Sequence, residues 1–243
     1  MRNGFTLLKS EMKRLVKYKI LTISLAISFL WMALLYFLGT ESARGFVGLF
    51  VAIDATIMSM LMIGASLYYE RQENTLKPML VTPIPISTMI IVKIMTTIYV
   101  ALQSGILVSL FVYFILDIQL QFLPLILLIS LVATVHAMIG IVLSLRSKDF
   151  TAYLVALIGY AIIFAYPSLF LALNILPEFL EFVLVLSPSH GAFIYMDQVF
   201  MVEGAYRYTS FIFIFSVVYL LAIITVLYLK WVRPRYAELA VRE

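Results

Sequence analysis

The chain has 243 residues, of which 64% are hydrophobic and only 12% are charged, and its mean hydropathy is +1.07. A soluble globular domain carries roughly 25% charged residues. A soluble protein of this length could not bury so much apolar surface, so we expect the membrane to be its solvent. The absence of cysteine excludes disulfides, thiolate metal sites and thiol nucleophiles.

Residues 1–19 predict an amphipathic helix in the membrane interface. Its apolar residues recur at steps of three and four: Phe5, Leu8, Met12 and Leu15. Its lysines recur at steps of four on another side: Lys9, Lys13 and Lys17. Such a helix turns its lysines toward anionic headgroups; the alternative is an ordinary basic flank of the first span. We do not expect a cleaved signal peptide, because the apolar run that follows is of full spanning length and has no small-x-small site.

Six later stretches reach the roughly 20 apolar residues that cross a bilayer as a helix. We therefore predict an all-α membrane protein with one transmembrane domain over residues 1–243 and spans at 20–39, 46–69, 92–116, 122–145, 151–173 and 209–230. An even number of spans leaves both termini on one side. Lys and Arg gather on that side, and only Arg44 and Arg207 fall on the other, so the positive-inside rule predicts cytoplasmic termini.

Three polar residues inside the spans are candidates for a translocation pathway: Asp54, Gln103 and His136. Intramembrane acids usually face a cavity or a partner, and a buried histidine can take up a proton. For each residue the alternative is a hydrogen bond that serves helix packing. Small residues at steps of four predict close helix contacts, with Ala101, Gly105 and Ser109 on the third span and Gly140 and Ser144 on the fourth.

The segment 174–208 is apolar in parts but is interrupted by Pro177, Pro188 and Gly191, and its apolar run 179–186 is too short to cross the bilayer. We expect a re-entrant helical hairpin in the outer leaflet, which is possible where protein covers the backbone. The sequence Ser-Pro-Ser-His-Gly at 187–191 is then the turn of this hairpin. The alternative is a loop that lies on the headgroups.

The most informative segment is residues 70–91 between the second and third spans. The run from Glu70 to Leu76 favours a helix that continues from the second span, and Pro78 should bend or end it. Thr-Pro-Ile-Pro at 82–85 predicts a rigid corner, and Ser87 can cap a short helix that leads through Lys93 into the next span. A plain solvated turn is the alternative, but it would need neither two prolines nor a helical run.

The chain has no Gly-x-x-x-x-Gly-Lys-Ser/Thr loop and no His-Glu-x-x-His, so neither ATP hydrolysis nor metalloprotease chemistry is expected of it. One possible class is a self-contained ion- or proton-coupled carrier that uses Asp54 and His136. Another is an assembly subunit with no transport of its own. If energy comes from ATP, it must enter from another chain.

The segment from Glu70 to Pro85 resembles the membrane subunit of type-2 ATP-binding cassette exporters. Their usual pattern is Glu-Arg-Glu-x-Gly-Thr-Leu-Glu-x-Leu-Leu-x-Thr-Pro, with a Lys after a short helix. The matching positions are Glu70, Arg71, Thr75, Leu76, Leu80, Thr82, Pro83 and Lys93. The departures are Gln72, Asn74 and Lys77, where the family commonly has an acid, a glycine and an acid. The layout of interfacial helix, six spans, cytoplasmic termini and re-entrant hairpin is similar as well.

The resemblance implies a permease subunit for ATP-driven export, multi-pass in the cell (plasma) membrane. Two such subunits, identical or related, would pair in the lipid bilayer with two ATPase subunits that bind ATP and Mg, while this chain binds no cofactor, metal or nucleic acid. Glu70 would form ion pairs at the dimer or gating interface, and residues 71–76 would contact the ATPase. The expected cargo is an amphipathic, drug-like molecule or a lipid. The coupling residues would be Glu70, Arg71, Gln72, Glu73, Asn74, Thr75, Leu76, Thr82 and Pro83.

Overall fold

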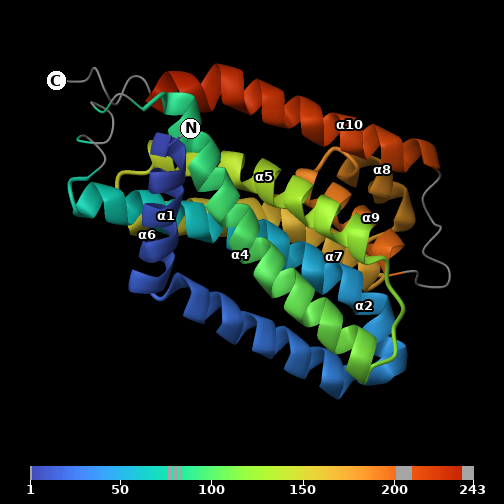
Figure 1. Ribbon diagram of the computed structural model, residues 1–243. Coiled ribbons are helices and arrows are strands. Elements are labelled where there is room, and N and C mark those ends of the chain that lie inside the picture. Colours follow the sequence, from blue (N-terminus) through green and yellow to red (C-terminus); the bar gives the residue numbers. More distant parts are fainter. Residues whose placement is uncertain (1, 76–77, 79–81, 83, 201–209, 237–243) are drawn as a thin grey trace.

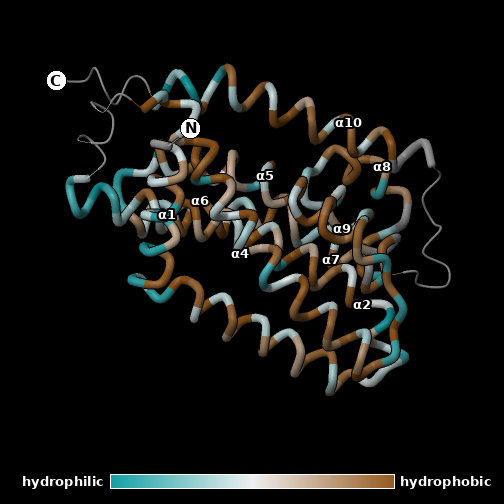
Figure 2. Tube along the Cα trace, viewed as in Figure 1, coloured by the Kyte–Doolittle hydropathy of each residue, from teal (hydrophilic) through white to brown (hydrophobic). Residues whose placement is uncertain are grey.

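Long helices lie side by side along most of the chain in the computed structural model, and one shorter helix crosses their end (Figure 1). The structure describes residues 2–75, 78, 82, 84–200 and 210–236, and every regular element within these ranges is helical. Apolar residues cover the long helices, whereas polar residues gather toward their ends (Figure 2). This distribution suits a bundle whose middle lies in hydrocarbon.

The crossing helix is α1, Arg2–Lys17, which packs against α2 and α4. Its buried residues are Leu7, Glu11 and Leu15, while Phe5 is 71% exposed. The inward face is therefore turned by about one residue from the predicted apolar stripe, because α1 lies on protein and not on lipid alone. The predicted amphipathic helix is present, but its buried face includes a carboxylate.

Helix α2, Ile20–Gln72, contains the first two predicted spans. A straight helix of 53 residues would be about 80 Å long, far more than the roughly 30 Å of a hydrocarbon core. The chain instead reverses around Gly39, whose φ of 75° and ψ of 159° lie outside the helical region and suit a residue without a Cβ. Tyr18 stacks on Tyr69, and the two arms of α2 (residues 20–38 and 40–72) run antiparallel.

The middle of the bundle consists of α4, Ile86–Ile115, and α5, Phe122–Arg146, both packed on α2. Helix α4 begins directly after Pro85, so the predicted short helix and the third span are one continuous element and Ser87 is not its cap. The helical segment after α5 has three consecutive parts: α6, Phe150–Tyr160; the π-helical turn η1, Ala161–Ala165; and α7, Tyr166–Ala172. Asp149 caps α6 by accepting a hydrogen bond from the Ala152 amide at 2.7 Å.

The segment after α7 forms the short turn η2, Glu178–Leu180, then α8, Glu181–Leu184, and α9, Pro188–Val199. The predicted turn at 187–191 is wrong, because Pro188 opens α9 as its first residue and Ser189, His190 and Gly191 are already helical. Helix α9 packs against α2, α5 and α10, Ser210–Leu227. The π-helical turn η3, Tyr228–Val232, extends α10.

Close contacts between helices occur at Gly140, one of the predicted small residues, and at Gly64, which was not predicted. A Cβ on Gly140 would lie 3.1 Å from the Met60 Cα, so α5 and α2 approach backbone to backbone there. A Cβ on Gly64 would fall 2.1 Å from a ring carbon of Tyr153, whose hydroxyl donates to the Met60 carbonyl. At both positions a larger side chain would overlap the neighbouring helix, so the close approach requires glycine.

Five helices in the described ranges are long and apolar enough to cross a membrane: Ile20–Gln72, Ile86–Ile115, Phe122–Arg146, Phe150–Leu171 and Ile214–Tyr236. The predicted all-α membrane protein is confirmed. This count takes α2 as one helix although it folds back on itself, and the number of six spans remains a prediction.

Candidate functional site

The second arm of α2 ends in a Schellman motif at the start of the segment 70–85. The Thr75 amide donates to the Glu70 carbonyl at 2.9 Å, and the Asn74 amide donates to the Arg71 carbonyl at 3.1 Å. Asn74 has a φ of 52°, in the left-handed region. Glycine is the most common residue at this position and asparagine the next, so Asn74 supplies what this helix end needs. The helix ends at Gln72 rather than continuing to Leu76 as predicted.

Glu70 lies in a buried group of charged side chains, which we call the ion network: Glu11 and Arg14 from α1, Glu70 from α2, and Lys93 from α4. The Lys93 Nζ lies 2.5 Å from the Glu70 Oε1, and the Arg14 Nη1 lies 2.6 Å from the same oxygen. Glu11 Oε1 lies 2.9 Å from Arg14 Nη1 and 3.5 Å from Lys93 Nζ. Three helices therefore meet at two carboxylates and two cations.

The ion network is balanced in charge and almost sealed from solvent. Glu70, Lys93 and Glu11 are 1%, 2% and 3% exposed, and Arg14 is 21% exposed. Burial raises the pKa of Glu11, but Lys93 and Arg14 outweigh burial and hold that pKa below its ordinary value. Breaking one ion pair would leave an uncompensated buried charge, so the three helices are held in one register.

Two further contacts fasten the same end of the bundle. Arg71 donates to the Ser144 and Ser147 carbonyls at 3.1 and 3.2 Å, which ties α2 to the end of α5. Glu73 accepts from Lys17 at 2.6 Å, and this hydrogen bond lowers the pKa of Glu73 and raises that of Lys17. The segment is thus attached to α1, α4 and α5 as well as to α2.

The predicted coupling residues divide into two groups. Glu70, Arg71 and Thr75 point into the protein and hold the helix end, whereas Gln72, Glu73, Asn74 and Thr82 are exposed. Leu76 and Pro83 lie outside the described residues. Within this chain Glu70 forms ion pairs with Arg14 and Lys93, and its expected role at a dimer or gating interface stays a prediction.

Sequence reasoning missed Glu11 and the role of Arg14. A usable signal was present, because Glu11 is the single acidic residue among the first 40 and stands three residues before Arg14. An acid isolated in a basic amphipathic helix is a candidate for a buried ion pair.

Asp54 lies between the two arms of α2 and is 3% exposed. Its Oδ1 accepts a hydrogen bond from the Trp31 indole at 3.0 Å, and nearby Ser28 and Ser104 share a hydrogen bond of 2.6 Å. The Nε2 of Gln103 is buried without a hydrogen-bond partner among the described residues. Asp54 therefore links the two arms of α2, as expected of a polar residue that serves helix packing.

His136 is completely buried and belongs to a different group. Its Nδ1 lies 2.8 Å from the Val132 carbonyl, which can only accept, so Nδ1 carries the hydrogen and Nε2 accepts from the Ser189 hydroxyl at 3.3 Å. Tyr160 donates to Ser189 at 3.1 Å, and His190 bonds Ser168 at 3.0 Å. These bonds fasten the start of α9 to α5, α6 and α7.

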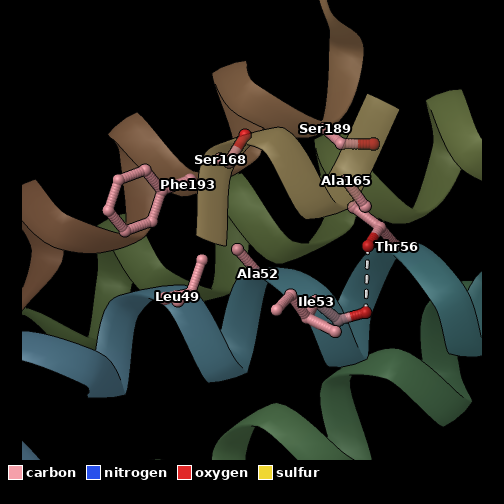
Figure 3. Close-up of a pocket in the computed structure, with 8 residues that line it drawn as sticks. All are labelled: Leu49, Ala52, Ile53, Thr56, Ala165, Ser168, Ser189 and Phe193. Atoms are coloured by element: carbon pink, nitrogen blue, oxygen red, sulfur yellow. Dashed lines mark hydrogen bonds between the residues drawn. The ribbon is translucent and has the colours of Figure 1, made fainter. Parts of the chain in front are cut away.

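Beside these bonds lies a small internal cavity of about 10 Å³, room for roughly one water molecule. Figure 3 shows its lining from α2, η1, α7 and α9, with three hydroxyl-bearing residues: Thr56, Ser168 and Ser189. Asp54 and His136 are held by separate hydrogen-bond groups, and within the described ranges no continuous series of hydrogen bonds joins them. A second, open groove of about 410 Å³ has an apolar and aromatic lining: Phe29, Met32, Ala33, Tyr36, Phe37 and Phe111.

The fold and the fastened helix end can be compared with known families. Residues 3–201 match the family model described as ABC-2 type transporter. The match covers most of the chain, and the protein therefore belongs to the ABC-2 type transporter family, as a membrane permease subunit of a type-2 ABC transporter. It is a multi-pass transport subunit and not itself the ATPase. No curated protein matches the sequence.

Proposed function

We propose that the chain is the permease of an ATP-driven exporter and receives the ATPase subunit at the exposed residues of the segment 70–85, namely Gln72, Glu73, Asn74 and Thr82. The observation that carries the proposal is the buried ion network immediately beneath these residues. A docking surface on a loose loop would move without effect, whereas this one is fastened to four helices. A displacement applied at Glu73 would reach the spans.

The transmission follows the contacts of the site. A push on the helix end moves Glu70, and the short ion pairs carry that movement to α1 through Arg14 and to α4 through Lys93. Arg71 carries it to α5 through two backbone carbonyls. Because packed helices shift as rigid bodies, a small displacement at one end tilts whole spans. ATP and Mg bind the partner ATPase and supply the closure that produces the push.

We also propose the subunit composition, the membrane and the orientation of the complex. The complex contains a second permease subunit, identical or related, in the plasma membrane, and both termini face the cytoplasm. That orientation is supported by the excess of Lys and Arg at the end of the bundle where α1 and the segment 70–85 lie. The lysine-bearing outer side of α1 then faces anionic headgroups.

We infer an amphipathic, drug-like molecule or a lipid as the cargo. The aromatic groove between α2 and α4 supports this class, because its lining offers apolar contact and opens to the side of the bundle. A panel of apolar compounds tested for stimulation of ATP hydrolysis by the purified complex would identify the class. Stimulation by strongly polar solutes alone would contradict it.

The coupling surface is tested by charge reversal at an exposed residue. Glu73→Lys should abolish the stimulation that assembly with the permease gives to the ATPase, while membrane insertion stays normal. Glu41→Lys is the matched control, because Glu41 is also exposed but lies beside the reversal at Gly39, at the opposite end of the second arm of α2 from Glu73. Equal stimulation in both variants would show that the ATPase binds elsewhere.

A proton-coupled carrier remains the second candidate, since Asp54 and His136 are both buried in the bundle. Transport that follows an imposed proton gradient without ATP, and that is lost in Asp54→Asn, would favour it. Dependence on a co-purifying ATPase would favour the permease.

A further inference from the structure

The last helix brings a tyrosine into a buried cluster that also contains residues of α2, α4 and α5. Beyond η3, Tyr236 is 1% exposed and its ring packs among residues of three other helices, including Leu67 of α2, Ile94 of α4 and Ile141 of α5. The Arg146 guanidinium lies over the Trp231 ring, 4.1 Å from its centroid, and holds η3 against the end of α5. The end of the last helix thus packs on α5 and shares a buried cluster with α2 and α4.

Two buried polar atoms in this region have no hydrogen-bond partner among the described residues: the Tyr236 hydroxyl and the Glu70 Oε2. The other oxygen of Glu70 already takes both Arg14 and Lys93. A phenol can donate, and a carboxylate oxygen can accept. Tyr236 packs in the same buried cluster as Leu67, which stands three residues before Glu70 on the same helix, so the phenol lies on the side of α2 that carries Glu70. Leaving both atoms unpaired is costly in a buried site.

The turn before Tyr236 gives this pair a means of closing. In η3 the Arg233 amide bonds the Tyr228 carbonyl five residues back, which is π-helical geometry. Such a turn shifts the register of everything that follows it, and π-helical turns are frequent at functional sites. A change of η3 toward α-helical geometry would move Tyr236 relative to α2 without disturbing α10.

We propose that Tyr236 is a positioning residue of the coupling site: it donates a hydrogen bond to Glu70 Oε2 when the ATPase closes, and so joins the last span to the ion network. This inference rests on the proposed function and adds the last helix to α1, α2, α4 and α5, which move together. The free oxygen of Glu70 is the acceptor kept for that state. The last span then follows α1, α2 and α4 instead of being left behind.

The test uses the full complex of the permease with its co-purifying ATPase, and the measured quantity is the stimulation of ATP hydrolysis by assembly. Tyr236→Phe keeps the buried ring and removes only the donor, and should reduce stimulation about tenfold, the factor that one charge-assisted hydrogen bond of about 1.4 kcal/mol controls. Tyr228→Phe, the same change in η3, is the control and should retain full stimulation. Unchanged stimulation in Tyr236→Phe would overturn the inference.

A double-mutant cycle separates a bond to Glu70 from a general packing effect. Tyr236→Phe combined with Glu70→Leu should lose little more than Glu70→Leu alone, because leucine offers no hydrogen-bonding group and both changes remove the same bond. Additive losses would overturn the inference and leave Tyr236 as a packing residue only. A wild-type complex without stimulation would instead contradict the proposed function, so the two failures are distinguishable.

Discussion

Lys93→Met is the sharpest perturbation of the ion network, because it removes one cation and keeps most of the side-chain volume. The network then holds Glu11, Glu70 and Arg14, with one net negative charge in a nearly sealed site. Breaking a buried pair by removing one partner costs about 3–5 kcal/mol. Arg14 still reaches Glu70 at 2.6 Å, so we expect the lower end, about 3 kcal/mol.

The assay is unfolding of the purified permease in mixed micelles, followed with temperature. A loss of about 3 kcal/mol should lower Tm by roughly 6–12 °C in a chain of this length. Lys9→Met is the matched control, because Lys9 lies on the exposed side of α1, and it should change Tm little. If Lys93→Met lowers Tm no more than Lys9→Met does, the ion network does not hold these helices together.

Three further outcomes follow from the structure. Gly64→Ala should destabilise the fold by about 1–3 kcal/mol, because its Cβ would overlap the Tyr153 ring, whereas Gly159→Ala, with nothing within 4 Å, should be neutral or better; denaturant titration of both variants checks this. Asn74→Val should lower stability by about 1–2 kcal/mol and Asn74→Gly should not, since only the former strains a left-handed φ; thermal unfolding distinguishes them. The pKa of Glu11 in the folded protein lies below its ordinary 4.5, so the ionised Glu11 stabilises the fold above pH 4.5 and this stabilisation is lost as the pH falls through the folded pKa. Glu11→Gln should therefore reduce the loss of unfolding free energy at acid pH, which a series of unfolding measurements at different pH values checks.

The sequence was sufficient to predict the structure where one physical rule controls the outcome. Hydropathy and length correctly predicted an all-α membrane protein, because every backbone amide in hydrocarbon must bond within its own helix. Small residues at steps of four marked real contacts, as Gly140 against Met60 shows. The first predicted span ends at Gly39, where the chain reverses, but the apolar pattern did not show that helical structure resumes directly after this residue.

Prediction was weaker where tertiary contacts compete with local preference. The run after Glu70 favours a helix, yet Asn74 adopts a left-handed conformation and ends it, because the backbone bonds of the Schellman motif satisfy the last carbonyls. The sequence Ser-Pro-Ser-His-Gly has turn composition, but Pro188 suits a first helical position equally well. The partners of Glu70 are Arg14, 56 residues before it, and Lys93, 23 residues after it, and no local sequence pattern predicts that these side chains meet.

The composition of the ion network suggests what it is for. Apolar residues of similar volume would often stabilise a buried site as well as an ion pair does, or better, so stability alone does not explain two carboxylates and two cations here. Apolar contacts permit sliding, whereas the 2.5–2.9 Å contacts of Glu70 with Lys93 and Arg14 and of Glu11 with Arg14 allow only one register. A helix end that must transmit displacement needs that fixed register more than it needs additional stability. We therefore interpret the ion network as the rigid joint between the exposed residues of the segment 70–85 and the spans.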